Sequence, residues 1–559
     1  MLTRPGAPLP HGSLLDTRRP RLLLTLFCLL LWLPGFFTLP PGDRDESRFV
    51  QATKQMLETS DFVRIMNGDV PRNRKPIGIH WLQAPFAAAA EAAGLARENP
   101  VWPYRIPSLL GGLVAVLATF WAGRALVGER AALLGAGALA ASVALTVEVH
   151  IAKTDAALLG ATMLAMGVLA RAALDPTSVR PRHAALFWLA MGVGVLLKGP
   201  ITPMIALLAA ATLEAWERRG RWLLALRPGW GVPLMLIVVL PWFAAIGAAT
   251  EGRFFEDAVG GDLGRKLAGG DDDHWGPPGL HLLLLPLLLF PASAALPGAL
   301  LGALRAAWEG STSAPTRVLL AWIVPAWLVF ELAPTKLPHY TLPLLPPLCL
   351  LLAAWALDPA RAGLPRRLAA LPAALVLLAA AALGGGALAL PLVLGEAAWI
   401  GVPGLLAAGL AAWLALRDRN PARAVTAGLA AAPLVYAAVL GWELPRLRPL
   451  WIAPQVVEAL ASLPAPPGTR LGAVGFHEPS LMFLAGTGTR WLPTGWDGAR
   501  ALASGEVGRV LVGDRDMAAF GEEAARLGLA THALAEVDGF NYSRGRRVKL
   551  TLLEAGAKP

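Results

Sequence analysis

Residues 230–249 read WGVPLMLIVVLPWFAAIGAA, a run without a charged side chain. A helix of about 20 residues spans about 30 Å, which is the thickness of the hydrocarbon layer of a membrane. Arginines crowd the segment before the run, at positions 218, 219, 221 and 227. Because basic residues concentrate in cytoplasmic loops, the pattern predicts a transmembrane helix that begins on the cytoplasmic side.

The rest of the chain repeats this pattern. Of the 559 residues, 55% are hydrophobic and only 16% are charged, which leaves too little polar surface for a soluble protein of this size. We predict a mostly α-helical, polytopic membrane protein with about thirteen spans. The predicted spans are 21–40, 103–126, 131–149, 154–173, 184–198, 200–215, 230–249, 278–300, 316–333, 338–357, 366–393, 398–416 and 421–442.

The positive charges orient these spans. With about thirteen spans and the N-terminus inside, every cytoplasmic loop carries arginine, as Arg124 and Arg130 illustrate. The segment Ile77–Leu95 is apolar but interrupted by polar residues, and counting it as a span would place nearly all these arginines outside. We therefore predict an interfacial or re-entrant helix there. The N-terminal apolar run lacks a small-residue cleavage site, so we expect a retained first span.

The chain divides into two predicted domains. Residues 1–442 form a transmembrane domain with outer loops at 41–102 and 250–277. Residues 443–559 lose the long apolar runs and alternate short strand-like stretches (471–476, 510–514, 548–553) with a helix-like one (517–527), which predicts a small mixed α/β domain outside the membrane.

Charge and cysteine usage exclude other classes. The net charge of +10 comes from short basic clusters between apolar runs, not from a basic face interleaved with aromatics, so we expect no nucleic-acid partner. Cys28 and Cys349 both lie in apolar runs, and we expect no structural disulfide. The sequence contains no P-loop, dinucleotide fingerprint or HExxH motif.

The first outer loop opens on acidic residues. Asp45 and Glu46 precede an apolar stripe at helical spacing, which predicts a helix on the membrane surface with carboxylates at its N-terminal end. Asp45 and Arg48 are three residues apart and can face each other. One interpretation is a helix cap with an ordinary ion pair. The other is an acid/base or acceptor-positioning carboxylate beside a membrane-embedded substrate.

Cations gather on the outer side, where basic residues are normally depleted. Arg72, Arg74 and Lys75 lie in the first outer loop, Lys198 lies where two spans meet, and Lys336 precedes Tyr340 by four residues. Each cation alone is compatible with snorkelling at the headgroup level. Together they require a negative partner, and a phosphate at that level would serve.

Two further acidic sites remain open to more than one interpretation. Asp155 begins a predicted span, either as a helix N-cap or as a carboxylate that orders an outer cation. In the loop 250–277, Asp271, Asp272 and Asp273 precede His274, a pattern that fits a solvated loop or a divalent-cation site with His274 as a ligand.

These motifs resemble a known family as an ordered set. Asp45-Glu46-x-Arg48, Lys75-Pro76 with Trp81, Thr154-Asp155, Lys198-Gly-Pro, His274-x-Gly-Pro and Lys336-Leu-Pro-x-Tyr340 are similar to the bacterial branch of the dolichyl-phosphate-mannose protein mannosyltransferase family. Within it, they resemble most the lipid A aminoarabinose transferases, which are GT-C glycosyltransferases. The resemblance covers roughly residues 20–350, and the stretch from Gly539 to Arg546 resembles the end of those proteins' periplasmic domain.

The resemblance implies a function. The donor would be a sugar on undecaprenyl phosphate, and the acceptor lipid A or a related glycolipid at the outer leaflet of a bacterial inner membrane, with inversion at the anomeric carbon. Asp45 would be the catalytic carboxylate, with Glu46 beside it. The other positions that match would bind substrate, most of them at the donor phosphate: Arg48, Lys75, Asp155, Lys198, Lys336 and Tyr340.

One position departs from the family pattern. Relatives often carry Glu before the Lys-Pro pair, and in some that Glu and a later loop histidine contact a metal ion. Here the position is Arg74, which argues against a divalent metal shared with His274 and leaves no certain cofactor.

Two other functions fit part of the pattern. The same chemistry directed at protein Ser/Thr or another glycan would differ only in the acceptor. A lipid or solute transporter would place paired ionisable residues near the middle of the bilayer and break helices in symmetric halves. In this chain the ionisable residues lie at the ends of spans.

Overall fold

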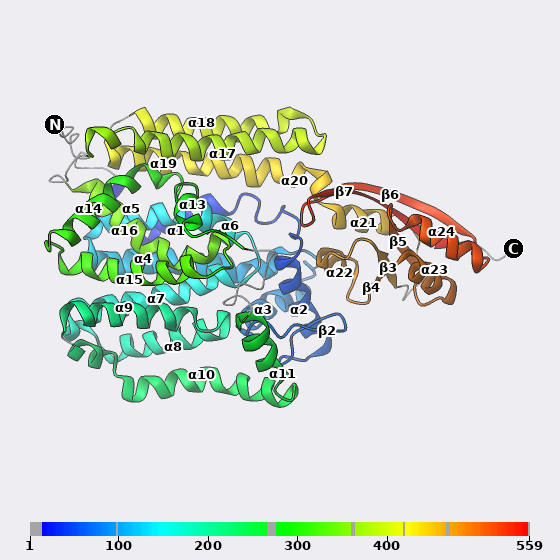
Figure 1. The fold of residues 1–559 in the computed structure, drawn as a ribbon, viewed down its shortest axis with the longest axis horizontal. Helices are drawn as coiled ribbons and strands as arrows, with labels where there is room; N and C mark the ends of the chain where they lie inside the picture. The colour runs from blue at the N-terminus through cyan, green and yellow to red at the C-terminus, as the bar shows by residue number, and fades with distance from the viewer. Residues whose placement is uncertain are drawn as a thin grey trace.

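The computed structural model describes residues 14–96, 99–218, 220–264, 275–358, 364–417, 420–464 and 470–556. It shows a long helical bundle with a smaller mixed α/β unit at one end (Figure 1). The helices α2 and α3 lie at that same end, between the bundle and the C-terminal unit. His274 and its three neighbouring aspartates lie outside the described residues.

The bundle is built from apolar helices. In chain order they are α1 (Pro20–Trp32), α4 (Trp102–Leu126), α5 (Glu129–Ala140), α6 (Val143–Val149), α7 (Thr154–Leu174), α8 (Pro181–Lys198), α9 (Ile201–Glu217), α10 (Pro228–Ala249), α13 (Leu280–Leu288), α14 (Leu296–Trp308), α15 (Ala314–Leu332), η7 (Pro338–Leu344) running into α16 (Leu345–Leu357), α17 (Leu371–Leu394), α18 (Val402–Arg417) and α19 (Pro421–Tyr436), which continues through η10 (Ala437–Glu443) and α20 (Leu444–Arg446).

Eight helices of the described chain are long and apolar enough to cross a membrane, or nine when the bent pair α5–α6 counts as one span. The protein is therefore a multi-pass membrane protein. The other predicted spans coincide with shorter, interrupted or less apolar helices, namely α1, α8, α9 and the stretch α13–α14. The first predicted span, 21–40, is helical only to Trp32, because Pro34 and Gly35 follow and Gly35 adopts a positive φ of 79°.

A helix is present where the sequence predicts an interfacial or re-entrant one, and it is not among the helices that are long and apolar enough to cross a membrane. It is α3 (Gly78–Ala92), and it packs against α2 (Asp45–Thr59). Thr53 of α2 donates to Gln83 Oε1 at 2.6 Å, and Gln83 Nε2 donates to the Ala152 carbonyl at 3.1 Å. Buried polar groups need such partners in a dry interior. The two side chains and the Ala152 carbonyl thereby fix α2 to the turn that precedes α7.

Close helix packing brings the turn before α7 to the same place. A Cβ on Gly111 of α4 would lie 2.4 Å from the Ala157 Cα of α7, a distance no real side chain tolerates. The glycine lets the two backbones approach, as small residues do in membrane helix pairs. Asp155, two residues before Ala157, is thus held at the end of the bundle where α2 and α3 lie.

The bend between α5 and α6 has a hydrogen-bonding cause. The helix pair turns by 57° at Ala141 and Ser142, which leaves backbone carbonyls outside the helical ladder. Trp32 Nε1 donates to the Ala140 carbonyl at 3.2 Å, and the Tyr436 hydroxyl donates to the Ala141 carbonyl at 2.6 Å. Satisfied carbonyls make a bend tolerable within a membrane protein. The bend directs α6, and Glu148 near its end, toward the same turn.

The C-terminal unit is the mixed β-sheet domain that the sequence predicts. Its sheet has the order β4-β3-β5-β7-β6, with β3 parallel to β4 and β5 and with β7 antiparallel to β5 and β6. Its elements are α21 (Ile452–Ala461), β3 (Leu471–Val474), α22 (Pro479–Ala485), β4 (Arg490–Leu492), α23 (Gly495–Ser504), β5 (Arg509–Gly513), α24 (Met517–Arg526), β6 (Thr531–Asn541) and β7 (Arg546–Ala555). The strands β4 and β6 and the helices α22 and α23 were not predicted.

The short elements of the outer loops complete the fold. They are the hairpin strands β1 (Met66–Asn67) and β2 (Val70–Pro71) after α2, and α11 (Arg253–Phe255) and the π-helix η4 (Glu256–Leu263) after α10. An antiparallel bridge joins Trp275 to Thr335 and ties the end of the second outer loop to the segment before η7.

Candidate active site

Asp45 is the first residue of α2, so its carboxylate lies where the partial positive charge of the helix favours an anion. Arg48 Nη1 lies 3.9 Å from the Asp45 carboxylate, and both side chains are about half exposed. Burial alone would raise the pKa of Asp45. The cations Lys75, Arg72, Lys153 and Arg48 outweigh burial and hold that pKa below its ordinary value. Asp45 is therefore an ionised carboxylate and a weak base.

Glu46 differs completely from its neighbour. Its side chain is 4% exposed and accepts two hydrogen bonds from Arg105, at 2.8 and 2.9 Å. The amides of Gly42 and Ala152 donate to it as well, at 2.7 and 2.8 Å. Both oxygens of Glu46 are thus occupied by the protein. This buried pair links the first outer loop to α4 and to the turn before α7.

A cavity of about 480 Å³ opens at the start of α2. It is the place where the structure brings the predicted residues together. Five of the eight predicted catalytic or substrate-binding residues line it: Asp45, Lys75, Asp155, Lys198 and Tyr340. Glu46, Arg48 and Lys336 are not part of this lining.

The cavity has a polar and an apolar wall. The apolar wall comes from α10, α11, α15 and η7, which lie far apart in the sequence. Its residues are Phe243, Phe254, Phe255, Val329, Phe330, Leu342 and Pro343. A site with cations at one end and aromatic and aliphatic side chains beside them suits an amphiphile that joins a phosphate to a hydrocarbon chain.

Lys75 is partly buried at the polar end. Burial lowers the pKa of Lys75 to about 8, and the nearby charge of Lys198 adds to the shift. Its Nζ lies 5.5 Å from the centre of the Phe49 ring, and the Arg72 guanidinium lies 4.3 Å from the same ring. The aromatic ring of α2 thus helps to hold two cations beside Asp45.

Asp155 is the centre of a charged network. Lys198 Nζ donates to Asp155 Oδ1, and Lys153 Nζ lies 3.7 Å from Asp155 Oδ2. Lys153 also contacts Glu148 Oε1 at 3.1 Å. His339 lies between the two carboxylates, 3.8 Å from each. Asp155 therefore orders the outer cations, the second of the two interpretations that the sequence left open.

Tyr340 and Lys336, four residues apart, have different surroundings. The Lys198 ammonium lies 5.5 Å from the centre of the Tyr340 ring, at the cavity wall. Lys336 is 5% exposed and donates to the carbonyls of Gly276 and Ala333 at 2.9 and 2.7 Å. These contacts direct Lys336 into the protein and fix the end of the second outer loop.

The metal hypothesis gains no support from this geometry. Arg74 lines the cavity at the position where relatives often carry Glu. Within the described ranges there is no group of three or more His, Cys, Asp or Glu side chains arranged to hold a metal ion. His274, the predicted ligand, lies outside those ranges.

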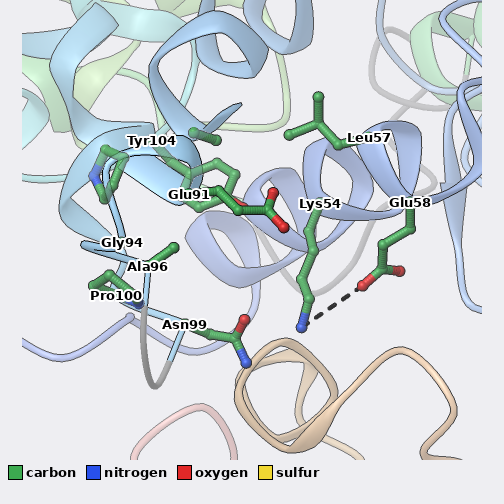
Figure 2. Close-up of a pocket in the computed structure, with 11 residues that line it drawn as sticks. Lys54, Leu57, Glu58, Glu91, Gly94, Ala96, Asn99, Pro100 and Tyr104 are labelled. Carbon is green, nitrogen blue, oxygen red and sulfur yellow. Dashed lines mark ion pairs between the residues drawn. The ribbon is translucent and has the colours of Figure 1, made fainter. Parts of the chain in front are cut away.

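A second cavity of about 480 Å³ lies farther along α2 (Figure 2). Lys54 and Glu58 of α2, Glu91 of α3 and Tyr104 of α4 line it. The Lys54 ammonium contacts Glu58 at 3.9 Å and donates to the Phe483 carbonyl at 3.0 Å. Among the described residues of its lining, Lys54 is the cation, and it already has protein partners. The cavity at Asp45 differs because Lys75 and Lys198 both line it.

Sequence reasoning missed three contributors to the first site. Glu148 lies inside a predicted span, Lys153 was read only as part of a turn, and Arg105 lies at the start of α4. All three are less than 10% exposed. Ionisable residues at the ends of apolar runs are functional signals in membrane proteins. Glu148 in particular could have been singled out on that ground.

Comparison with known proteins finds a family model that matches part of the chain. Residues 74–244 match the model described as dolichyl-phosphate-mannose-protein mannosyltransferase. The matched segment includes Lys75, Asp155 and Lys198 but not Asp45 or Tyr340.

Curated proteins are similar over a longer stretch of the chain. The chain is 32% identical over 340 residues to the undecaprenyl phosphate-alpha-4-amino-4-deoxy-L-arabinose arabinosyl transferase of Pseudomonas aeruginosa strain LESB58. It is 29% identical over 357 residues to the enzyme of the same name from Pectobacterium carotovorum. The matches span 58% and 60% of this chain, and 58% of the length of each relative.

Solved structures share the fold over nearly the whole chain. The crystal structure of ArnT from Cupriavidus metallidurans bound to undecaprenyl phosphate matches with a TM-score of 0.73 and 20% identity, covering 95% of this chain and 97% of that one. The apo structure of the same protein matches with a TM-score of 0.68 and 19% identity. This chain thus has the ArnT-like fold over nearly its whole length.

Proposed function

We propose that this protein transfers a sugar from undecaprenyl phosphate to lipid A or a related glycolipid at the outer leaflet of a bacterial inner membrane. The observation that carries the proposal is the cavity at Asp45, where Lys75, Lys198 and Tyr340 line one end and an aromatic wall lines the other. A lipid phosphate fits both ends. The names of the curated relatives support this donor, and aminoarabinose is the first sugar to test.

The arginine-rich loops support thirteen crossings with the cavity and the C-terminal domain in the periplasm. Each predicted span coincides with a helix or a helix pair. In this orientation the site lies outside the cytoplasm, where nucleotide sugars are absent and a lipid-linked donor is the available form. The division at residue 442 would then separate the membrane domain from the periplasmic one.

The reaction we propose is a single displacement. An acceptor oxygen attacks the anomeric carbon from the face opposite the leaving group, and the bond from that carbon to the lipid phosphate oxygen breaks, with inversion. The bonding electrons go to the lipid phosphate, whose extra negative charge Lys75 and Lys198 stabilise. Fixed cations in a water-poor cavity lower such a barrier without reorganisation.

The low pKa of Asp45 favours a phosphate as the acceptor. A hydroxyl nucleophile needs a base, and a carboxylate surrounded by Lys75, Arg72, Lys153 and Arg48 is a poor one. An acceptor phosphate is already ionised. We propose that Asp45 orients the acceptor and that Arg48 assists at the phosphate. Glu46, bonded to Arg105, and Lys336, bonded to backbone carbonyls, would stabilise the protein around the cavity.

The test is transfer of aminoarabinose by membranes that contain the full-length protein. Asp45→Asn should lower the rate by about 10²- to 10³-fold. The matched control is Asp61→Asn, which removes a carboxylate near the other end of α2 that pairs with Arg64 at 2.8 Å. Wild-type rates in Asp45→Asn membranes would contradict the site. Lipid A masses that stay unchanged while glycoproteins gain sugar would contradict the acceptor.

A further inference from the structure

The loop that carries Asp45 is held by the C-terminal domain as well as by the bundle. The amide of Asp43, two residues before Asp45, donates to the Tyr542 hydroxyl at 2.5 Å. The Ser480 hydroxyl donates to Asp43 Oδ1. Tyr542 lies in the turn between β6 and β7, and Ser480 lies in α22. Two elements far apart in the sequence thus meet on one residue of the first outer loop.

Those two elements are themselves joined by a buried carboxylate. Glu478, 3% exposed, accepts hydrogen bonds from Asn541 Nδ2 at 2.9 Å and from the Ser543 hydroxyl at 2.5 Å. Glu478 lies just before α22, and Asn541 and Ser543 flank Tyr542. The bonds therefore fix the relative position of Ser480 and Tyr542 before either reaches Asp43.

The backbone between Asp43 and Asp45 requires such support. Arg44 has a φ of 64° and a ψ of −101°, a strained conformation for a residue with a side chain. Conformations of this kind are unfavourable and persist only where the surroundings impose them. On the other side of Arg44, Glu46 is fixed by Arg105. Before Arg44, Gly42 is held by Glu46 and Ser47, and Asp43 makes its side-chain and amide contacts with the C-terminal domain.

Contacts continue along α2. Gln51 Nε2 donates to the Thr487 hydroxyl at 2.9 Å, and that hydroxyl donates to Glu58 at 2.7 Å. Lys54 donates to the Phe483 carbonyl at the end of α22 at 3.0 Å. In Figure 2 the Lys54 ammonium points toward the brown ribbon of the C-terminal domain. The domain therefore follows α2 from the loop before Asp45 to its last turn.

We propose that Ser480, Tyr542 and Glu478 form a clamp by which the C-terminal domain positions Asp45 for the reaction. The clamp residues are positioning residues, since they touch Asp43 and one another and none of them lines the cavity. The inference rests on the proposed function for its catalytic readout. It predicts that loosening the clamp lowers turnover and leaves donor binding, which depends on Lys75 and Lys198, unchanged.

The experiment uses the full-length protein in lipid nanodiscs and the double variant Ser480→Ala/Tyr542→Phe, which removes only two hydroxyls. Misplacement of a reacting group by about 1 Å costs on the order of 10²-fold in rate. We therefore expect kcat to fall by about 10- to 100-fold, with the KM for the lipid-linked donor within about twofold of wild type. The control is Lys549→Ala, which breaks an exposed pair with Glu536 elsewhere in the same domain.

Rescue separates positioning from simple folding. Asp43→Asn keeps an oxygen that accepts from Ser480 and should retain most activity, whereas Asp43→Ala should match the double variant. Hydrogen exchange of amides 42–48 should accelerate in the double variant and not in the control. Wild-type kcat and unchanged exchange in the double variant would overturn the clamp. If the wild type itself transfers no sugar, the proposed function fails, and the exchange rates alone decide whether the clamp holds α2.

Discussion

Two cavities of about 480 Å³ meet α2, one at its start and one in its second half, and they differ in what their charges do. In the first, Lys75 and Lys198 lie with Asp45 and Asp155 beside an aromatic wall. In the second, Lys54 contacts Glu58 and the Phe483 carbonyl (Figure 2). Volume alone does not identify a site. A group of interacting charged residues beside an apolar wall does.

The largest difference is expected between two variants that each remove one carboxylate, one variant in each cavity. Asp155→Asn should lower transfer by about 100-fold or more, because Lys198 and Lys153 lose the anion that places them. Glu91→Gln, in the second cavity, should leave the rate within about twofold. The measurement is the initial rate with saturating donor. Equal losses in the two variants would remove the distinction between the cavities.

A second prediction concerns pH. The pKa of Lys75 is lowered to about 8 by burial and by Lys198, and in the proposed reaction the ammonium form binds the donor phosphate. Transfer efficiency, kcat/KM for the donor, should therefore fall as pH rises through about 8, by about tenfold for each further pH unit. Lys75→Arg, which keeps its charge, should shift the fall to higher pH. A wild-type profile that stays flat to about pH 10 would contradict a donor-binding role for Lys75.

A smaller effect is expected at Tyr340. Removing its hydroxyl in Tyr340→Phe keeps the ring beside Lys198 and removes one hydrogen-bonding group from the cavity wall. The KM for the donor should rise by about fivefold, the value of about 1 kcal/mol for one hydrogen bond. Tyr104→Phe supplies the matched change in the second cavity, and there the KM should not move.

The smallest expected effect is a dependence of the protein's stability on pH. Burial, more than the charge of Glu478, raises the pKa of Asp43 to about 7 from an ordinary value of 3.8, against the lowering effects of Ser480 and Arg44. Tyr542 and Glu46 face the same loop. Because the folded state holds the proton more tightly, this stabilisation is present at acid pH and is lost as pH rises through about 7.

The melting temperature should therefore fall by roughly 2 °C from about pH 5.5 to about pH 7.5 through this group. Other groups also titrate in this range, so the comparison is with Asp43→Asn, in which the slope should be shallower by that amount. Parallel melting curves of the two proteins across this range would show that Asp43 does not titrate there.

Much of the fold could be predicted because the signals are local. Uninterrupted apolar runs and flanking arginines predicted the helices of the bundle, and strands β3, β5 and β7 follow from short runs of branched residues. The first span was predicted too long because its apolar composition continues past Pro34, while the helix does not. Strand β6 was missed, since its mixed composition gains strand character only from pairing with β7.

The position of the site in the chain could be predicted from the sequence, but many contacts of its residues could not. Asp45 and Glu46 read as one acidic pair, yet neighbouring helix residues point about 100° apart, so only one of them faces the cavity. That separation follows from helix geometry and could have been drawn from the sequence. The hydrogen bonds from Arg105 to Glu46 could not be predicted from the sequence, because 59 residues separate the two. Lys336 likewise became an anchor through a carbonyl of the second outer loop.

The hydrogen bond between Asp43 and Tyr542 joins residues 499 positions apart, which gives the protein an order of assembly. A ribosome releases the first outer loop long before it has made the turn between β6 and β7. A nascent chain that stops before residue 541 contains every lysine of the cavity but cannot complete the loop that presents Asp45. The contact between Asp43 and Tyr542 can therefore form only after the last two strands have been synthesised.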